Sequence, residues 1–188
     1  MMESNNFVPD AARAIYAPSA LYQDIHQGRR TPGWLLVAVY CGIYAVYSIL
    51  AYLAGRAPSV DPWLKIDLDA YYLVQALFIV PLILALWVQA AGTIHMLSRL
   101  SGGKGSFDRT LTMTGYSLWL PWLIFLVFDI VLAPGLAHDL VFAACMFLAL
   151  AGTSMAVEIE QGIEWGYAFL AALVAILATA VLMFTLVR

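Results

Sequence analysis

The sequence predicts an all-α membrane protein, a bundle of about five transmembrane helices with a short N-terminal interfacial helix. Two observations predict this fold class. Apolar residues make up 63% of the 188 residues and charged residues only 11%, against about 25% charged in soluble domains, so the chain has too little polar surface to cover itself in water. The apolar residues also fall into long runs, and roughly 20 helical residues cross a bilayer core.

Five apolar segments are expected to span the bilayer and to form one domain of residues 34–188. Their predicted bounds are 34–55, 71–97, 112–132, 140–157 and 166–187. Between the third and fourth segments stands Ala133-Pro134-Gly135, whose proline and glycine are typical turn residues. We therefore expect the third and fourth segments to form a tight helical hairpin.

Pairs of small residues recur at four-residue spacing in three of these segments. Such pairs let helix backbones approach closely. They can serve packing within the bundle or association between subunits, and the spacing leaves both alternatives open. The pairs are Ala38 with Gly42, Gly152 with Ala156, and Ala168 with Ala172.

Residues 1–33 are predicted to be a cytoplasmic tail with a short amphipathic helix. They lack the apolar core of a signal peptide, so the first apolar run is expected to stay in the membrane. Pro18 is typical of a first helical position and Gly28 of a helix stop. Three apolar residues between them share one helical face: Leu21, Tyr22 and Ile25. We expect this helix to lie on the membrane surface, with a disordered leader as the alternative, and residues 1–8 to be loose.

Lysine and arginine in the short loops predict the orientation, because they are enriched on the cytoplasmic side. The tail contributes Arg13, Arg29 and Arg30, the second loop contributes Arg99, Lys104 and Arg109, and the first loop has only Arg56 and Lys65. The charged residues of the loop at 158–165 are all acidic, and acidic residues contribute little to the orientation of a membrane protein. We therefore expect the N-terminus in the cytoplasm and the C-terminus, at Arg188, outside.

Composition and spacing argue against several classes of function. A net charge of −3 without a basic stripe predicts no nucleic-acid binding. Cys41 and Cys145 have no C-x-x-C partner, so free buried thiols are expected. His26 and His95 are assigned to the inside and His138 to the outside, so they cannot converge on a metal ion. No cofactor is predicted.

The glycine-rich segment 101–106 does not match a phosphate-binding loop. That motif needs a glycine five residues before its Gly-Lys pair, where this chain has Ser98. We predict a turn between two helices, with Ser106 as the cap of the second helix and Asp108 at its positive end. No Gly-x-Ser-x-Gly nucleophile elbow occurs, and no catalytic residue is predicted.

Ionisable residues inside the segments, and prolines that interrupt a helix there, are the default candidates for a transport path. The ionisable candidates are His95, near the inner end of the second segment, and Asp129, near the outer end of the third. Pro81 and Pro121 can kink their helices, either to frame a substrate site or as packing kinks. With no other charge inside the segments, we expect a bundle without buried charge. This expectation favours assembly over transport.

Three pieces of the sequence resemble the Yip1 domain family of small multi-span membrane proteins. The tail segment 15–25 looks like the Pro-Ser-x-x-Phe-x-x-Ile segment that bacterial members carry shortly before their first span. The second piece is a histidine at a helix end followed by a Gly-Gly loop. The third resembles the Gly-Tyr-Ser-Leu-x-Pro signature, with its proline one residue later. The family-motif residues are Pro18, His95, Gly102, Gly103, Gly115, Tyr116 and Pro121.

We expect a non-enzymatic protein of this type that acts through helix-mediated assembly with other membrane proteins, as a homo-oligomer or accessory subunit, or through organisation of the bilayer. The short tail looks like that of bacterial members and implies a bacterial cytoplasmic membrane. One alternative is a small transporter or channel-like permease with His95 or Asp129 near its path. A second is Rab-type GTPase-linked trafficking, as in eukaryotic relatives, whose Asp-Leu-Tyr-Gly-Pro motif this tail lacks.

Overall fold

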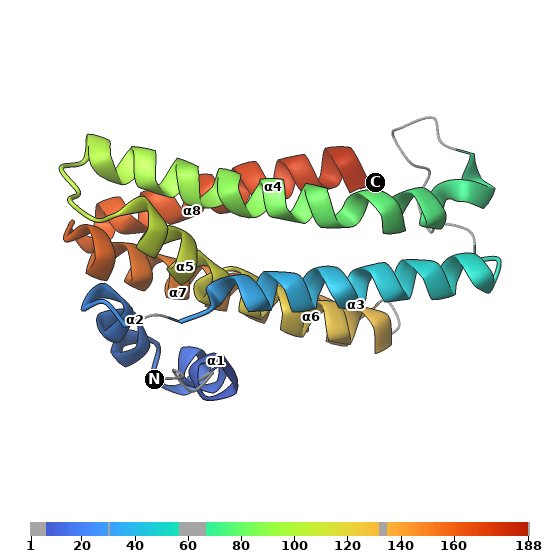
Figure 1. The fold of residues 1–188 in the computed structure, drawn as a ribbon, viewed down its shortest axis with the longest axis horizontal. Helices are drawn as coiled ribbons and strands as arrows, with labels where there is room; N and C mark the ends of the chain where they lie inside the picture. The colour runs from blue at the N-terminus through green and yellow to red at the C-terminus, as the bar shows by residue number, and fades with distance from the viewer. Residues whose placement is uncertain (1–6, 30, 57–66, 132–134, 188) are drawn as a thin grey trace, which may run out of the picture.

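The computed structural model describes residues 7–29, 31–56, 67–131 and 135–187, which form an elongated helical bundle (Figure 1). Within these ranges there is no strand, and five helical stretches are long and apolar enough to cross a membrane. The predicted all-α membrane bundle is therefore confirmed. Expectations about residues 1–6, Arg30, Lys65, Ala133, Pro134 and Arg188 lie outside the described residues.

The helices follow one another with short connections. In chain order they are α1 (Phe7–Tyr16), α2 (Pro18–His26), α3 (Gly33–Leu53), the 3-10 turn η1 (Leu68–Ala70), α4 (Tyr71–Leu100), α5 (Phe107–Ser117), α6 (Trp119–Val131), α7 (Leu136–Gln161) and α8 (Trp165–Val187). α3 packs on α4, α4 on α8, and α7 on both α8 and α6. We call the end that holds loop 101–106 the glycine-loop end.

The third span differs from its predicted form. It begins at Phe107 and is interrupted at Leu118, which separates α5 from α6. Pro121 accounts for the interruption, because it has no N–H to donate to the carbonyl of Ser117 and its ring crowds that carbonyl. Pro81 does not break its helix, since α4 is continuous through this residue. The side chain of Pro81 is exposed.

α2 packs its apolar face against the bundle. The predicted helix begins at Pro18 as expected, and Leu21, Tyr22 and Ile25 are only 0%, 1% and 2% exposed. Their neighbours are residues of α5, α6 and α7, including Tyr116. Protein therefore covers the face that we expected to meet the membrane surface.

A second tail helix, α1, is tied to α2 by ion pairs. Phe7 and Val8, expected to be loose, begin this helix. An Arg29 nitrogen lies 2.8 Å from an oxygen of Asp10 and another lies 3.2 Å from Asp24, while Arg13 lies 2.8 Å from Asp24. Burial raises the pKa of Asp10, although the nearby guanidinium groups of Arg29 and Arg13 act to lower it. The hydrogen bond from Arg13 is the main cause that lowers the pKa of Asp24.

Ile25→Ala is expected to release the tail from the bundle. Removing this buried side chain costs about 2 kcal/mol, which corresponds to about a 30-fold shift in the docking equilibrium. Trypsin cleavage after Arg29, followed by mass spectrometry in mild detergent, should accelerate by about that factor. Gln23→Ala, on the exposed face of the same helix, is the matched control and should change nothing. Rapid cleavage of the unaltered protein would argue against a docked tail.

Candidate functional site

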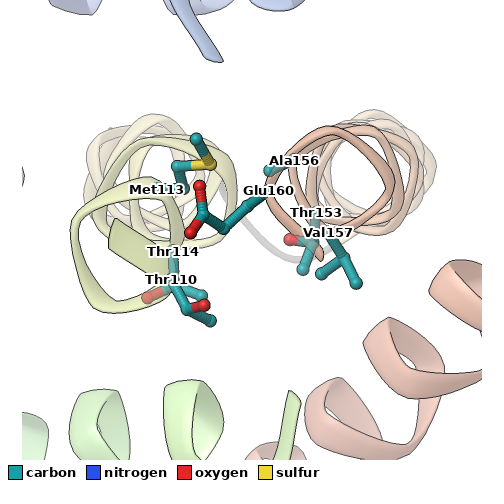
Figure 2. Close-up of a pocket in the computed structure, with 7 residues that line it drawn as sticks. All are labelled: Thr110, Met113, Thr114, Thr153, Ala156, Val157 and Glu160. Atoms are coloured by element: carbon teal, nitrogen blue, oxygen red, sulfur yellow. The ribbon is translucent and has the colours of Figure 1, made fainter. Parts of the chain in front are cut away.

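α5 and α7 enclose a small cavity beside a buried carboxylate (Figure 2). Its volume is about 10 Å³, close to the least that one water needs. It is lined by Thr110, Met113, Thr114, Thr153, Ala156, Val157 and Glu160. The Thr110 hydroxyl donates to the backbone carbonyl of Ser106, and the Thr114 hydroxyl donates to that of Leu111. Because ligand sites usually enclose a few hundred Å³, this cavity is too small for a substrate.

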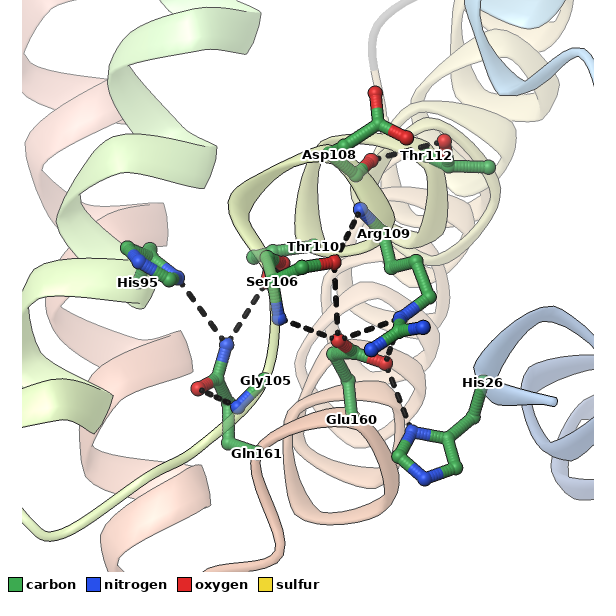
Figure 3. Close-up of polar contacts among 10 residues, drawn as sticks. All are labelled: His26, His95, Gly105, Ser106, Asp108, Arg109, Thr110, Thr112, Glu160 and Gln161. Carbon is green, nitrogen blue, oxygen red and sulfur yellow. Dashed lines mark hydrogen bonds and ion pairs between the residues drawn. The ribbon is translucent and has the colours of Figure 1, made fainter. Parts of the chain in front are cut away.

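A polar cluster fills the glycine-loop end, where the last turn of α7 meets loop 101–106 (Figure 3). Its centre is the neighbouring pair Glu160 and Gln161, both 2% exposed. We define the glycine-loop cluster as this pair together with the residues that contact it: His26, His95, Gly105, Ser106, Arg109 and Thr110. It joins α2, α4, α5 and α7.

Glu160 accepts hydrogen bonds from two segments and contacts a third. The backbone N–H of Ser106 donates to Oε1 at 2.7 Å. The Nε of Arg109 lies 2.9 Å from Oε1 and 3.1 Å from Oε2, and Nδ1 of His26 lies 2.9 Å from Oε2. These partners offset the cost of removing the carboxylate from water.

The expectation of a bundle without buried charge is wrong. Glu160 of α7 is only 2% exposed. The prediction ended the fourth segment at residue 157 and assigned Glu160 to a loop, but α7 continues to Gln161. At the end of the span an arginine and the loop backbone can reach the carboxylate, so burial does not leave it unpaired.

Gln161 holds the glycine loop against α7. Its Oε1 accepts a hydrogen bond from the N–H of Gly105 at 3.1 Å, and its backbone carbonyl accepts one from the N–H of Lys104 at 3.0 Å. Its Nε2 donates to Thr110 at 2.9 Å and lies 3.4 Å from Nδ1 of His95. One side chain therefore fixes the loop to α4, α5 and α7.

The glycines of the loop allow this close approach. A Cβ on Gly103 would lie 2.8 Å from the carbonyl oxygen of Ser98, and one on Gly105 would lie 2.5 Å from that of Glu160. Gly102 has φ +87°, a left-handed conformation that glycine adopts readily. Ser106 caps α5 by accepting from the N–H of Arg109 at 3.4 Å. The predicted capped turn between two helices is confirmed.

The Gly-Tyr motif brings the start of α3 against α5. A Cβ on Gly115 would lie 2.5 Å from the carbonyl oxygen of Gly33, and one on Gly33 would lie 2.4 Å from that of Thr112. The two backbones are therefore in direct contact. Tyr116, 1% exposed, packs in the same cluster as the apolar face of α2, so this motif and the tail helix that begins at Pro18 meet in one core.

The two predicted path residues lie at opposite ends of the bundle. His95 belongs to the glycine-loop cluster, whereas Asp129 lies in the last turn of α6, with Oδ1 2.9 Å from Nε2 of His138. The 25-residue stretch Phe107–Val131 separates these ends, a length of more than roughly 30 Å. No group of three His, Cys, Asp or Glu side chains that could hold a metal ion occurs within the described ranges.

Sequence reasoning missed Glu160, Gln161 and Arg109 as members of a site. Helical spacing was the signal that could have found the first two. Buried positions recur along α7 at i, i+3, i+4, i+7 and i+8: Thr153, Ala156, Val157, Glu160 and Gln161. The polar pair therefore continues the buried stripe of the span instead of beginning a loop.

Comparison with known proteins gives one family. A family model described as Yip1 domain matches residues 12–187. The matched range includes α2, the five spans up to residue 187 and every residue of the glycine-loop cluster. No curated protein and no solved structure matches the chain.

Proposed function

The chain belongs to the Yip1 domain family, and from that premise we propose a non-enzymatic role: helix-mediated assembly with other membrane proteins or with a second copy of the chain. Its five apolar spans make it an integral, multi-pass membrane protein. We place it in a bacterial cytoplasmic membrane, with the N-terminus in the cytoplasm and the C-terminus outside.

The distribution of basic residues supports this orientation. The glycine-loop end carries basic residues of the tail, of α4, of the loop and of α5: Arg13, Arg29, Arg99, Lys104 and Arg109. Arg56 follows α3 at the opposite end. Because lysine and arginine in short loops are enriched on the cytoplasmic side, the glycine-loop end is the cytoplasmic one in our proposal.

The outward face of α3 is the observation that carries the assembly proposal. Ala38 and Gly42 are exposed, and a Cβ on Gly42 would meet no atom within 4 Å. In the other two pairs, Ala156, Ala168 and Ala172 are 0–2% exposed and pack within the bundle. α3 therefore presents a small-residue pair to the bilayer, and such pairs allow close contact between membrane helices.

Large apolar side chains flank this pair along the same helix. Those exposed include Val39, Val46, Leu50 and Leu53. A neighbouring helix that approached the small pair could also pack against these residues. Because lipid tails are as apolar as leucine, close van der Waals packing, rather than removal from water, would hold such a contact together.

Gly42→Leu is expected to weaken self-association at least tenfold, equivalent to about 1.4 kcal/mol, because its side chain would separate the two helices. Resonance energy transfer between donor- and acceptor-labelled copies in liposomes, measured against the protein-to-lipid ratio, gives the association constant. Gly92→Leu is the matched control, since a Cβ there also meets no atom within 4 Å and the position lies in α4.

The same variants test assembly with a different membrane protein. A neighbour that co-purifies from native membranes with the unaltered chain and with Gly92→Leu, but not with Gly42→Leu, would support a hetero-complex. A chain that shows no energy transfer and gives no crosslinked neighbour in native membranes would refute the assembly proposal.

The transport alternative has less support. Pro81 is exposed on the outside of α4, and His95 and Asp129 lie at opposite ends of the bundle. Substrate flux in reconstituted vesicles that is lost in His95→Ala or Asp129→Asn would favour transport over assembly. The Rab-type alternative depends on the source, and a prokaryotic source excludes it.

A further inference from the structure

α1 carries an apolar face that the rest of the described chain leaves uncovered. Four exposed apolar residues recur along it at helical spacing: Val8, Ala12, Ile15 and Tyr16. Val8, Ile15 and Tyr16 are 72%, 62% and 73% exposed. Positions i, i+4, i+7 and i+8 share one side of a helix, so these side chains form a continuous stripe. We call it the α1 stripe.

The charged residues of α1 lie on its other side. Asp10 is completely buried and pairs with Arg29, and Arg13 pairs with Asp24 at 2.8 Å. The two carboxylates and two guanidinium groups of these pairs sum to zero charge. The α1 stripe is therefore both apolar and uncharged, while the opposite side of the helix is held by protein.

The place of α1 in the fold indicates what covers the stripe. In Figure 1, α1 lies across the long axis of the bundle, level with the beginning of α3. Trp34, the second residue of α3, is 57% exposed. Tryptophan and tyrosine are enriched where membrane spans meet the headgroups, and Tyr16 lies at the end of α1. The stripe and the exposed start of the first span therefore lie at the same level along the bundle.

We propose that α1 is a membrane-surface helix whose stripe lies in the headgroup region of the cytoplasmic leaflet. An amphipathic helix in this position buries its apolar face by about 5–10 Å. Apolar burial holds it there, rather than attraction to anionic headgroups, because the ion pairs neutralise its charges. α2, which the sequence assigned to the membrane surface, instead joins α1 to α5 and α7. This role does not depend on assembly, since a monomer would have the same surface helix.

Spin labels test this placement in the intact protein. A nitroxide is attached at Val8→Cys, at Ile15→Cys or at Gln23→Cys, the last on the exposed polar face of α2, in nanodiscs of phosphatidylcholine with or without phosphatidylglycerol. Both native cysteines are buried, and the unaltered protein measures their background labelling. Power saturation then compares collisions with oxygen, which enters lipid, and with a water-soluble nickel chelate.

Labels at positions 8 and 15 are expected to favour oxygen over the nickel chelate several-fold more than the label at position 23. The ratio should be the same in neutral and anionic lipid. Ile15→Ser should lower the oxygen preference of the position 8 label at least twofold, because it removes apolar area from the stripe. Equal access of nickel at positions 8 and 23 would place the stripe in water and overturn the proposal. Shielding from both reagents would place protein against it, with the same consequence.

Discussion

Glu160→Ala is expected to lower the free energy of unfolding by about 3–5 kcal/mol, the usual cost of removing one partner from a buried ion pair. The change leaves the N–H of Ser106 and the guanidinium of Arg109 without their shared acceptor. His26 of the tail helix α2 loses its contact with the last turn of α7. Arg109 and His26 are 37% and 46% exposed, so water replaces part of what they lose. We therefore expect the lower end of the range.

Unfolding of purified protein in mixed detergent micelles, followed by circular dichroism, measures this effect. Glu160→Gln is the informative companion, because it keeps the volume and one acceptor oxygen while removing the charge, and it should fall between the unaltered protein and Glu160→Ala. Glu158→Ala is the matched control on a partly exposed position of the same helix. If the two alanine variants unfolded alike, the cluster would contribute nothing to stability.

Gly115→Leu is expected to separate the start of α3 from α5. Even a Cβ at this position would lie 2.5 Å from the carbonyl oxygen of Gly33, and backbone, unlike a flexible side chain, cannot move aside locally. Overpacking a core usually costs about 1–3 kcal/mol and occasionally more. Because two helix backbones must move apart here, we expect a loss at or above the top of that range.

Gly92→Ala and Gly115→Ala give the graded comparison. A Cβ on Gly92 meets no atom within 4 Å, so alanine there should be neutral or stabilise by up to about 1 kcal/mol through its better helix propensity. Gly115→Ala should destabilise, and Gly115→Leu should destabilise more, in the same unfolding assay. An intact monodisperse protein with unchanged stability for Gly115→Leu would show that α3 and α5 are not in backbone contact.

The spans could be predicted because the bilayer imposes a simple requirement on sequence. A helix that crosses hydrocarbon needs about 20 apolar residues with no unpaired charge, and this chain shows five such runs. Pro18 could be assigned to a helix start and Ser106 to a cap, because those positions depend on local backbone chemistry. The break before Pro121 depends on its missing N–H, and the proline was recognised as a kink site.

The candidate site could be predicted only in pieces. His95, the glycine pair and the Gly-Tyr motif stood out as short patterns, but nothing in their spacing indicates that Gln161 contacts both His95 and the loop. Glu160 was assigned to a loop, because a carboxylate in an apolar run is read as the end of a span. Its partners come from α2 and α5, more than 50 residues away in the chain for Arg109 and more than 130 for His26.

The sequence by itself determined the number of spans, their order and the family, because each depends on local composition or short motifs. Only the tertiary structure decided which small-residue pair faces outward, which tail helix is covered by protein, and that a carboxylate is buried at the glycine-loop end. The physical reason is the same in all three cases. Periodicity shows that a helix has a face, but what covers that face depends on how distant segments pack.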